Sequence, residues 1–235
     1  MIRVGTSGYN YPEWKGRFYP ERLAAADMLG YYAGRFSTVE INYSFYRMPS
    51  VKLLTGWAGQ VPEEFTFSLK APRRITHEKR LRDCGDVVRF FCETASALGA
   101  RGGVLLFQLP PNLKCDLGLL DAFLETIPPG TRAAFEFRHP SWLDDAVYQR
   151  LAARELALCV ADSEDRHTPL LATADYGYVR LRDQGYTDAD LETWARRIGG
   201  ETRWREVFVY FKHEEEGKGP EFAASFTRAL QDLHA

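Results

Sequence analysis

The sequence lacks the features that would assign it at once to a membrane, secreted or metal-binding class. It has no run of 18 apolar residues and no charged leader before an apolar stretch, so we expect neither a membrane span nor a secretion signal. The four cysteines are widely spaced and form no C-x-x-C pair, which disfavours a zinc site or a disulfide framework. These absences predict a cytoplasmic protein with reduced thiols and no membrane contact.

An excess of charge of one sign is also missing, as are the short motifs of several enzyme classes. Thirty Lys and Arg against 32 Asp and Glu give a net charge of -2, so a role in binding nucleic acid would need a local basic patch. The chain contains neither a G-x-S-x-G elbow nor a P-loop. Its five histidines are too scattered for a polynuclear cluster. We therefore predict no metal and no organic cofactor.

What the chain does have is eight short apolar runs, each ending at polar or charged residues and most followed by a segment with helical character. Eight strands alternating with helices are typical of the α/β class and predict a (β/α)8 TIM barrel. With 235 residues, 45% of them hydrophobic, and no linker, the whole of 1–235 is predicted to form one domain. The runs are Ile2–Gly8, Thr38–Ser44, Phe65–Ala71, Gly103–Leu109, Ala133–His139, Leu156–Asp162, Tyr178–Gln184 and Val207–His213.

The connections between the runs predict seven helices and one irregular crossover. Asp162–Ala174 is too short and broken for a full helix, so the sixth helix is expected to be reduced. Two long loops, Tyr9–Ala24 with five aromatics and Pro72–Gly85 with five cations, follow strands and should lie over the C-terminal face. The expected helices are Ala25–Phe36, Val51–Gln60, Asp86–Gly99, Leu117–Thr126, Leu143–Arg154, Asp188–Ile198 and Glu221–Leu233.

Polar residues alternate with apolar ones along the runs, and this alternation predicts which side chains face the inside of the barrel. An unpaired charge facing the helices would cost several kcal/mol, so the polar set should point inward and gather near the mouth. Five of its members are cationic and three acidic, which favours an anionic ligand such as a phosphate or carboxylate. The inward set is Ser7, Glu40, Asn42, Lys70, Gln108, Glu136, Arg138, Asp162, Arg180, Arg182, Tyr210 and Lys212.

Roles within this set follow from residue chemistry. Two carboxylates in one pocket can act as acid and base, so Glu136 and Glu40 are the catalytic candidates, with Asp162 third. The alternative is that Glu40, Glu136 and Arg180 form a buried ion-pair layer that only closes the barrel. Asn42 and Gln108 would orient a substrate, and the cations would hold its anion. The further predicted substrate-binding residues are Ser7, Tyr46, Tyr210, His139 and Trp142. For His139, a simpler role is to fix the turn into Ser141 and Trp142.

The leading hypothesis is an enzyme that performs acid/base chemistry, hydrolysis or lysis, on a small anionic and phosphorylated substrate at the C-terminal barrel face. One alternative is a nucleic-acid-binding or nuclease-like barrel that uses the basic loop 70–82 with nearby aromatics. Another is a metal-dependent phosphoesterase or sugar isomerase with Glu136, Asp162 and His213 as ligands. The sequence does not choose an oligomeric state.

Several motifs resemble, in the same order, those of the domain-of-unknown-function 72 (YecE-like) family. The resemblance covers essentially the whole chain and implies a TIM-barrel fold but no established activity. The chain departs from the family pattern at Arg182-Asp183, where His-Gly is usual, and at Lys212-His213, where Asn-Asn is usual. Both departures add positive charge at the expected mouth. The motifs are Val39–Asn42, Phe45–Ser50, Lys70–Arg73 with Ile75–His77, Leu106–Pro111, Glu136–Trp142, Tyr178–Leu181 and Tyr210–Phe211.

Overall fold

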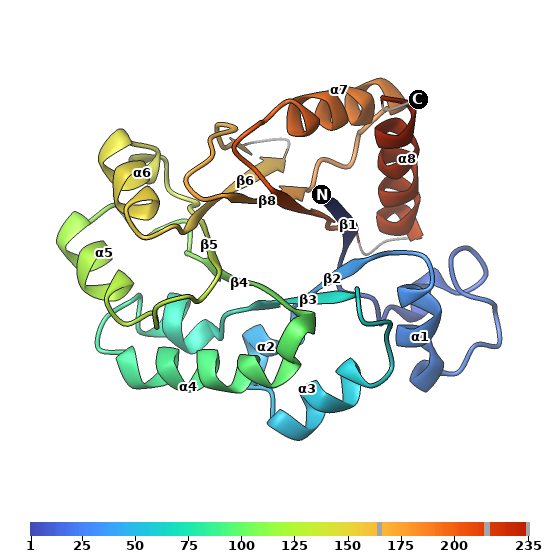
Figure 1. Ribbon diagram of the computed structural model, residues 1–235, viewed down its shortest axis with the longest axis horizontal. Helices are drawn as coiled ribbons and strands as arrows, with labels where there is room; N and C mark the ends of the chain where they lie inside the picture. The colour runs from blue at the N-terminus through green and yellow to red at the C-terminus, as the bar shows by residue number, and fades with distance from the viewer. Residues whose placement is uncertain (164–165, 214–216, 234–235) are drawn as a thin grey trace.

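The computed structural model describes residues 1–163, 166–213 and 217–233. At its centre eight parallel strands close into a barrel, because β9 pairs back with β1 and β5 pairs with β6. A ring of helices surrounds the strands (Figure 1). This is the predicted (β/α)8 TIM-barrel architecture. Its strands are β1 (Ile2–Ser7), β2 (Thr38–Ile41), β3 (Thr66–Lys70), β4 (Gly102–Gln108), β5 (Ala133–Glu136), β6 (Ala157–Ser163), β8 (Tyr176–Leu181) and β9 (Glu206–Phe211).

The helices cover the outside of the barrel. A short extra helix, α2 (Tyr43–Tyr46), lies directly after β2, and the sequence pattern did not predict it. A π-helical turn at Arg74–Glu78 follows β3. The remaining α-helices are α1 (Met28–Ala33), α3 (Val51–Ala58), α4 (Gly85–Ala95), α5 (Leu117–Leu124), α6 (Asp145–Ala152), α7 (Asp188–Gly199) and α8 (Lys218–Asp232).

The connection from β6 to β8 is irregular, as predicted. The short strand β7 (Arg166–His167) pairs antiparallel with the end of β6. Among the described residues between β6 and β8 there is no helix. The sixth helix of the barrel is therefore replaced by a β-hairpin and an extended crossover.

Two separate apolar clusters confirm most of the predicted strand alternation. Residues such as Val39, Phe107 and Val209 pack outward against the helices. Leu106 and Phe208 belong to a smaller cluster inside the barrel. Burying a polar group without a partner costs free energy, so the strand face that packs on the helices is apolar. The inner face can carry polar groups because it opens to solvent at the ends of the barrel.

Gly5 of β1 is required by a close approach of neighbouring atoms. A Cβ built there would lie 2.0 Å from the Thr38 carbonyl oxygen and 2.9 Å from the Tyr32 hydroxyl. The same hydroxyl accepts a hydrogen bond from the backbone N–H of Thr6 at 2.7 Å. Gly5 therefore allows the Thr38 backbone of β2 and the Tyr32 hydroxyl of α1 to approach β1 closely.

The long aromatic loop after β1 is mainly a packing element. Trp14 and Tyr19 are each 1% exposed. Phe18 packs on the rings of Tyr32 and Phe36, which belong to α1 and the turn after it. This loop thus seals the outer side of β1, and most of its aromatic surface is not open to a ligand.

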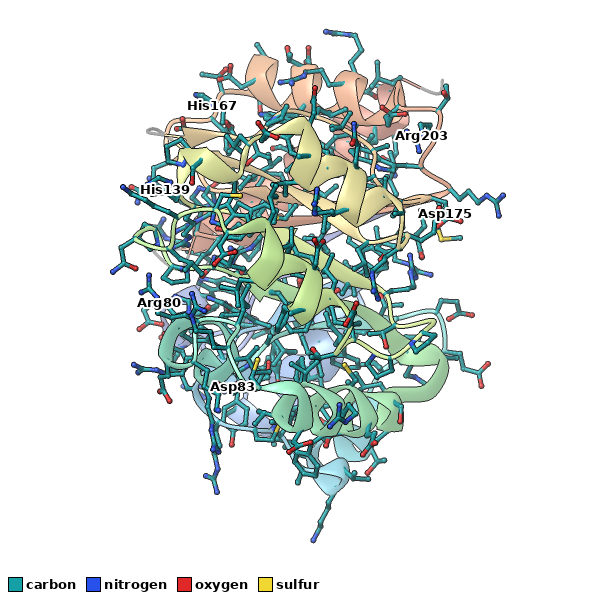
Figure 2. All side chains as sticks on the ribbon, turned by 90° about the vertical axis from the view of Figure 1, so that its left-hand side faces the viewer. Arg80, Asp83, His139, His167, Asp175 and Arg203 are labelled. Atoms are coloured by element: carbon teal, nitrogen blue, oxygen red, sulfur yellow. The ribbon has the colours of Figure 1, made fainter. Side chains whose placement is uncertain are left out.

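The two ends of the barrel are distinguished in Figure 2. Arg80 and His139, which follow β3 and β5, lie along one edge. Asp175 and Arg203, which precede β8 and β9, lie along the opposite edge. The first edge is therefore the C-terminal face, where TIM barrels carry their sites. None of the described helices is long and apolar enough to cross a membrane.

Candidate functional site

A buried arginine bridges two carboxylates from different parts of the barrel. The Arg180 guanidinium, on β8, donates through Nη2 to Glu40 Oε1 of β2 at 2.9 Å and through Nη1 to Glu136 Oε2 of β5. All three side chains are at most 1% exposed. Their positions match the predicted inward alternation, and together they form the buried ion-pair layer.

Each carboxylate has further hydrogen-bond donors. Glu40 accepts from the Ser7 hydroxyl, and from Tyr178 Oη at 2.6 Å. Tyr178 is not among the predicted site residues, although its inward position on β8 could have indicated it.

Glu136 is supported in a similar way from its own side of the barrel. It accepts from Gln108 Nε2 at 2.7 Å and from Arg138 Nε at 3.0 Å. The four charges of Arg180, Arg138, Glu40 and Glu136 balance one another, so this layer is electrically neutral.

These contacts fix the protonation of the glutamates. Burial alone would raise the pKa of Glu136, but Arg180 and Arg138 outweigh it and hold that pKa well below its ordinary value of 4.5. Burial likewise opposes the charged form of Glu40, and Arg180 with the Ser7 and Tyr178 hydroxyls holds its pKa below the ordinary value. Both side chains are therefore carboxylates at neutral pH. Their predicted catalytic role remains a prediction, whereas the contacts establish their structural role.

Asp162 does not belong to the inward set, and this part of the prediction was wrong. It shares the side of β6 occupied by Leu158 and Val160, which pack toward the helices. Its carboxylate contacts His167 Nδ1 and accepts from Tyr186 Oη at 2.6 Å. The hairpin that replaces the sixth helix supplies His167, so a buried charge on the outward side has local partners that the alternation did not reveal.

Without Asp162, the predicted inward set contains five cations and two carboxylates, Glu40 and Glu136, and both carboxylates pair with Arg180. Lys70 stands out among the cations. It ends β3 and is 9% exposed, and its Nζ lies 4.0 Å from the centre of the Phe45 ring. Within the described part of the chain, Lys70 Nζ has neither a hydrogen bond nor an ion pair.

The environment of Lys70 disfavours its charge. Burial and then the nearby positive charge of Arg180 lower the pKa of Lys70 to about 7. The positive charge of Arg138 also contributes to this lowering, whereas the negative charges of Glu40 and Glu136 raise the pKa of Lys70. Lys70 is therefore divided between its charged and neutral forms at neutral pH.

Arg182 is a second cation that forms no ion pair with a carboxylate among the described residues. Its Nε is buried and has no hydrogen-bond partner among the described residues. Burial and then Arg180 lower its pKa, with Arg138 adding to the effect. Arg138 itself is 21% exposed and reaches from Glu136 toward the mouth. Lys212, the remaining predicted cation, is half-buried at the end of β9.

Asn42 connects the polar layer to a cavity. Its Nδ2 donates to Ser7 Oγ at 3.0 Å. The cavity, about 210 Å³ in volume, lies above β1 and β2 and is lined by Tyr9, Tyr11, Asn42, Tyr43 and Trp57 among others. Asn42 can therefore orient a group that enters from this aromatic side.

Four further predicted substrate contacts differ in their surroundings. Trp142 is fully buried and donates through Nε1 to the Leu113 carbonyl at 2.7 Å, so it is a core residue. Tyr210 is also fully buried, and its hydroxyl bonds to Ser68 and Thr38 in a deeper layer. His139 Nδ1 accepts from the Ser141 backbone N–H at 3.2 Å, which confirms its turn-fixing role. Tyr46 is 74% exposed and contacts Phe45.

The basic loop after β3 is anchored by buried residues and partly neutralised. Ile75 and Leu81 are buried beneath it. Arg73 pairs with Glu78 at 3.1 Å, and Arg80 donates to the Asn112 side-chain and backbone oxygens. Because Trp14 and Trp142 are buried, they cannot serve as the stacking platforms that the nucleic-acid alternative used.

The ligands of the metal alternative are not brought together. Within the described chain no group of three or more His, Cys, Asp or Glu side chains is arranged to hold a metal ion. Asp162 faces outward. His213 donates through Nε2 to the Asp183 carbonyl at 2.7 Å and packs on Phe222. The two segments in which the chain departs from the family pattern thus lie side by side at the ends of β8 and β9.

Comparison with known proteins supplies a family but no activity. A family model described as "Protein of unknown function DUF72" matches residues 3–235. The chain is 32% identical over 143 residues to the UPF0759 protein YecE of Escherichia coli K12, which covers 60% of this chain and 50% of that protein. It is 24% identical to the UPF0759 protein YunF of Bacillus subtilis, over 92% of this chain and 80% of that protein. The chain thus spans about half the length of its YecE relatives.

Solved structures agree with this match. A DUF72 family protein from Thermotoga maritima superimposes with a TM-score of 0.87 at 26% identity, covering 98% of this chain and 99% of that one. A DUF72 family protein from Enterococcus faecalis gives a TM-score of 0.81 at 19% identity, covering 98% and 96% of the two chains, and this similarity concerns the fold alone.

Proposed function

The chain belongs to the DUF72 family of TIM-barrel proteins, and we propose that it is an enzyme performing acid/base chemistry, hydrolysis or lysis, on a small anionic substrate at the C-terminal mouth of its barrel. The substrate that we propose is a phosphorylated compound. The observation that carries the proposal is a pair of cations, the buried Lys70 and the half-buried Arg182, neither of which forms an ion pair with a carboxylate among the described residues.

An anion bound between Lys70, Arg138 and Arg182 would supply the missing negative charge. Phosphate and carboxylate oxygens accept hydrogen bonds from guanidinium groups in the geometry that arginine prefers. Gln108 and Asn42 orient the remainder of the substrate. Glu40 and Glu136 hold the arginines in position, and both are carboxylates at neutral pH because Arg180 keeps their pKa values below the ordinary 4.5.

Lys70 is the group suited to proton transfer. A catalytic acid or base works best when its pKa lies near the operating pH, and the pKa of Lys70 is about 7. In its neutral form Lys70 can accept a proton from the bound substrate and return it later in the reaction.

Thermal unfolding with sodium sulfate tests this proposal, because sulfate does not titrate near neutral pH. At a ligand concentration of 100 Kd, binding adds about 2.7 kcal/mol of stability, which is roughly 5 to 11 °C in Tm for a chain of this size. We expect Arg182→Gln to remove most of that shift. The matched control is Arg203→Gln, on the opposite face of the barrel (Figure 2). If Arg182→Gln and Arg203→Gln respond to sulfate as fully as the parent protein, the anion site is wrong.

A further inference from the structure

We propose that Lys70 is an amine nucleophile that forms a covalent imine with the carbonyl group of an anionic substrate. The inference deepens the proposed function and rests on it, because the anion site would hold the substrate beside the amine. The substrate class is a small keto or aldehyde compound that also carries a carboxylate or a phosphate.

The position of Lys70 is fixed more firmly than a surface lysine would be. Its backbone pairs with Leu106 of β4, and its carbonyl accepts from Ser44 Oγ at 2.7 Å. Phe45, on the helix that Ser44 belongs to, covers Nζ from one side. A nucleophile held by a strand and a packed ring reacts from a narrow range of geometries, which favours attack on a bound carbonyl.

The surroundings leave the lone pair of the amine available. Lys79, by comparison, donates through Nζ to the Asp83 carbonyl at 2.6 Å, and Lys52 is exposed to solvent. Lys70 has no such bond within the described residues, and nine-tenths of its surface is removed from water. With a pKa of about 7 against about 10.4 for a free lysine, its neutral fraction at pH 7 is on the order of a thousandfold larger.

The cations nearby match a carbonyl compound that also bears an anion. Arg138 and Arg180 are close enough to Lys70 to lower its pKa, and Arg138 acts on Arg182 in the same way. A carboxylate or phosphate held by Arg138 and Arg182 would direct the adjoining carbonyl carbon toward Nζ. The same cations stabilise negative charge that develops on the carbonyl oxygen during attack.

The covalent step balances without an added oxidant or reductant. The Nζ lone pair forms a C–N bond to the carbonyl carbon, the C=O π electrons move to oxygen, and this oxygen takes up a proton. Nζ then gives up one proton and keeps the other, the oxygen takes up a second proton from solvent and leaves as water, and the C=N bond forms as a protonated imine. The protonated imine draws electrons from the neighbouring carbon and allows a carbon–carbon bond there to break, which is a lysis reaction.

Reductive trapping tests the inference on the intact protein. The protein is incubated with sodium cyanoborohydride and one of three probes: pyruvate, dihydroxyacetone phosphate or acetone. Pyruvate and dihydroxyacetone phosphate distinguish a carboxylate from a phosphate substrate, and acetone is the uncharged control. Peptide mapping by mass spectrometry then measures the modification of Lys70 relative to Lys52.

We expect at least one anionic probe to modify Lys70 tenfold or more faster than Lys52, and sulfate to slow that reaction. Acetone should show no such preference. Lys70→Arg should lose the fast modification, while Lys52→Arg should keep it. The comparison within the parent protein decides the matter even if Lys70→Arg does not fold.

Two outcomes would count against the inference in distinguishable ways. If sulfate stabilises the parent through Arg182 but no anionic probe modifies Lys70 preferentially, the imine is wrong and the anion site stands. If sulfate has no effect and Lys70 reacts no faster than Lys52, both the imine and the proposed function fail.

Discussion

Replacing Glu136 with glutamine separates a structural role of this side chain from a catalytic one. Glu136 is 1% exposed and accepts from Arg180, Arg138 and Gln108. In Glu136→Gln the buried Arg180 guanidinium would keep only Glu40 as a counter-charge, and the new amide NH2 or oxygen could not satisfy all three donors. Breaking a buried ion pair in this way costs about 3–5 kcal/mol.

For a chain of this length that cost corresponds to a fall of roughly 6 to 20 °C in Tm. The assay is urea unfolding followed by tryptophan fluorescence, with scanning calorimetry for Tm. Asp86→Asn is the control, because it breaks a pair between Asp86 and Arg89 that is open to solvent, where we expect no measurable change. A loss of less than about 1 kcal/mol in Glu136→Gln would refute the structural reading of the ion-pair layer.

The remaining predictions concern pH, the charge of Lys70, the position of Asp162 and the basic loop. Because the folded-state pKa values of Glu40 and Glu136 lie below 4.5, their contribution to stability is present above that pH, and acid titration should show it being lost as pH falls below 4.5. The pKa of Lys70 is lowered from 10.5 to about 7, so between these pH values the unfolded chain binds a proton that the folded chain does not. Burying Lys70 therefore destabilises the fold most below pH 7, and this cost falls as the pH rises toward 10.5. Lys70→Met should raise Tm more at pH 6 than at pH 10, which calorimetry at the two pH values measures. Asp162→Asn should lower stability by about 1–3 kcal/mol in urea unfolding but leave the sulfate-induced Tm shift unchanged, since Asp162 lies outside the site. Arg73→Gln combined with Arg74→Gln should reduce both the affinity and the salt slope of single-stranded DNA binding in an anisotropy titration; if the parent protein does not bind at low salt, the nucleic-acid alternative is wrong.

Strand alternation was a sufficient guide to most of the barrel interior. Glu40, Glu136 and Arg180 could be assigned to the inner face from sequence, because a buried charge needs polar partners. In this barrel the outer face of the strands packs on apolar helix surfaces, so such partners are expected on the inner face. The same reasoning failed at Asp162, because a hairpin supplied His167 as a partner on the outer side. Sequence spacing contains no information about such a local replacement of a helix.

Residues whose role depends on distance were harder to predict. The alternation gives Lys70 an inward direction, but its position over the Phe45 ring requires α2, a four-residue helix with no periodic signal. Trp142 follows a strand end in the sequence, yet the 3-10 turn from Pro140 rotates it into the core. Which cations remain unpaired could be learned only from the contacts themselves.

The bridge through Arg180 also bears on how such a barrel could have been assembled from parts. The eight barrel strands can be divided into two halves of four, β1–β4 and β5, β6, β8 and β9. Glu40 belongs to the first half, whereas Arg180 and Glu136 belong to the second. A separated first half would retain the Glu40 carboxylate without its cation, and a separated second half would retain Arg138 and Arg180 with only the Glu136 carboxylate. The polar layer is therefore complete only in the joined molecule, and the two halves of this protein are not interchangeable modules.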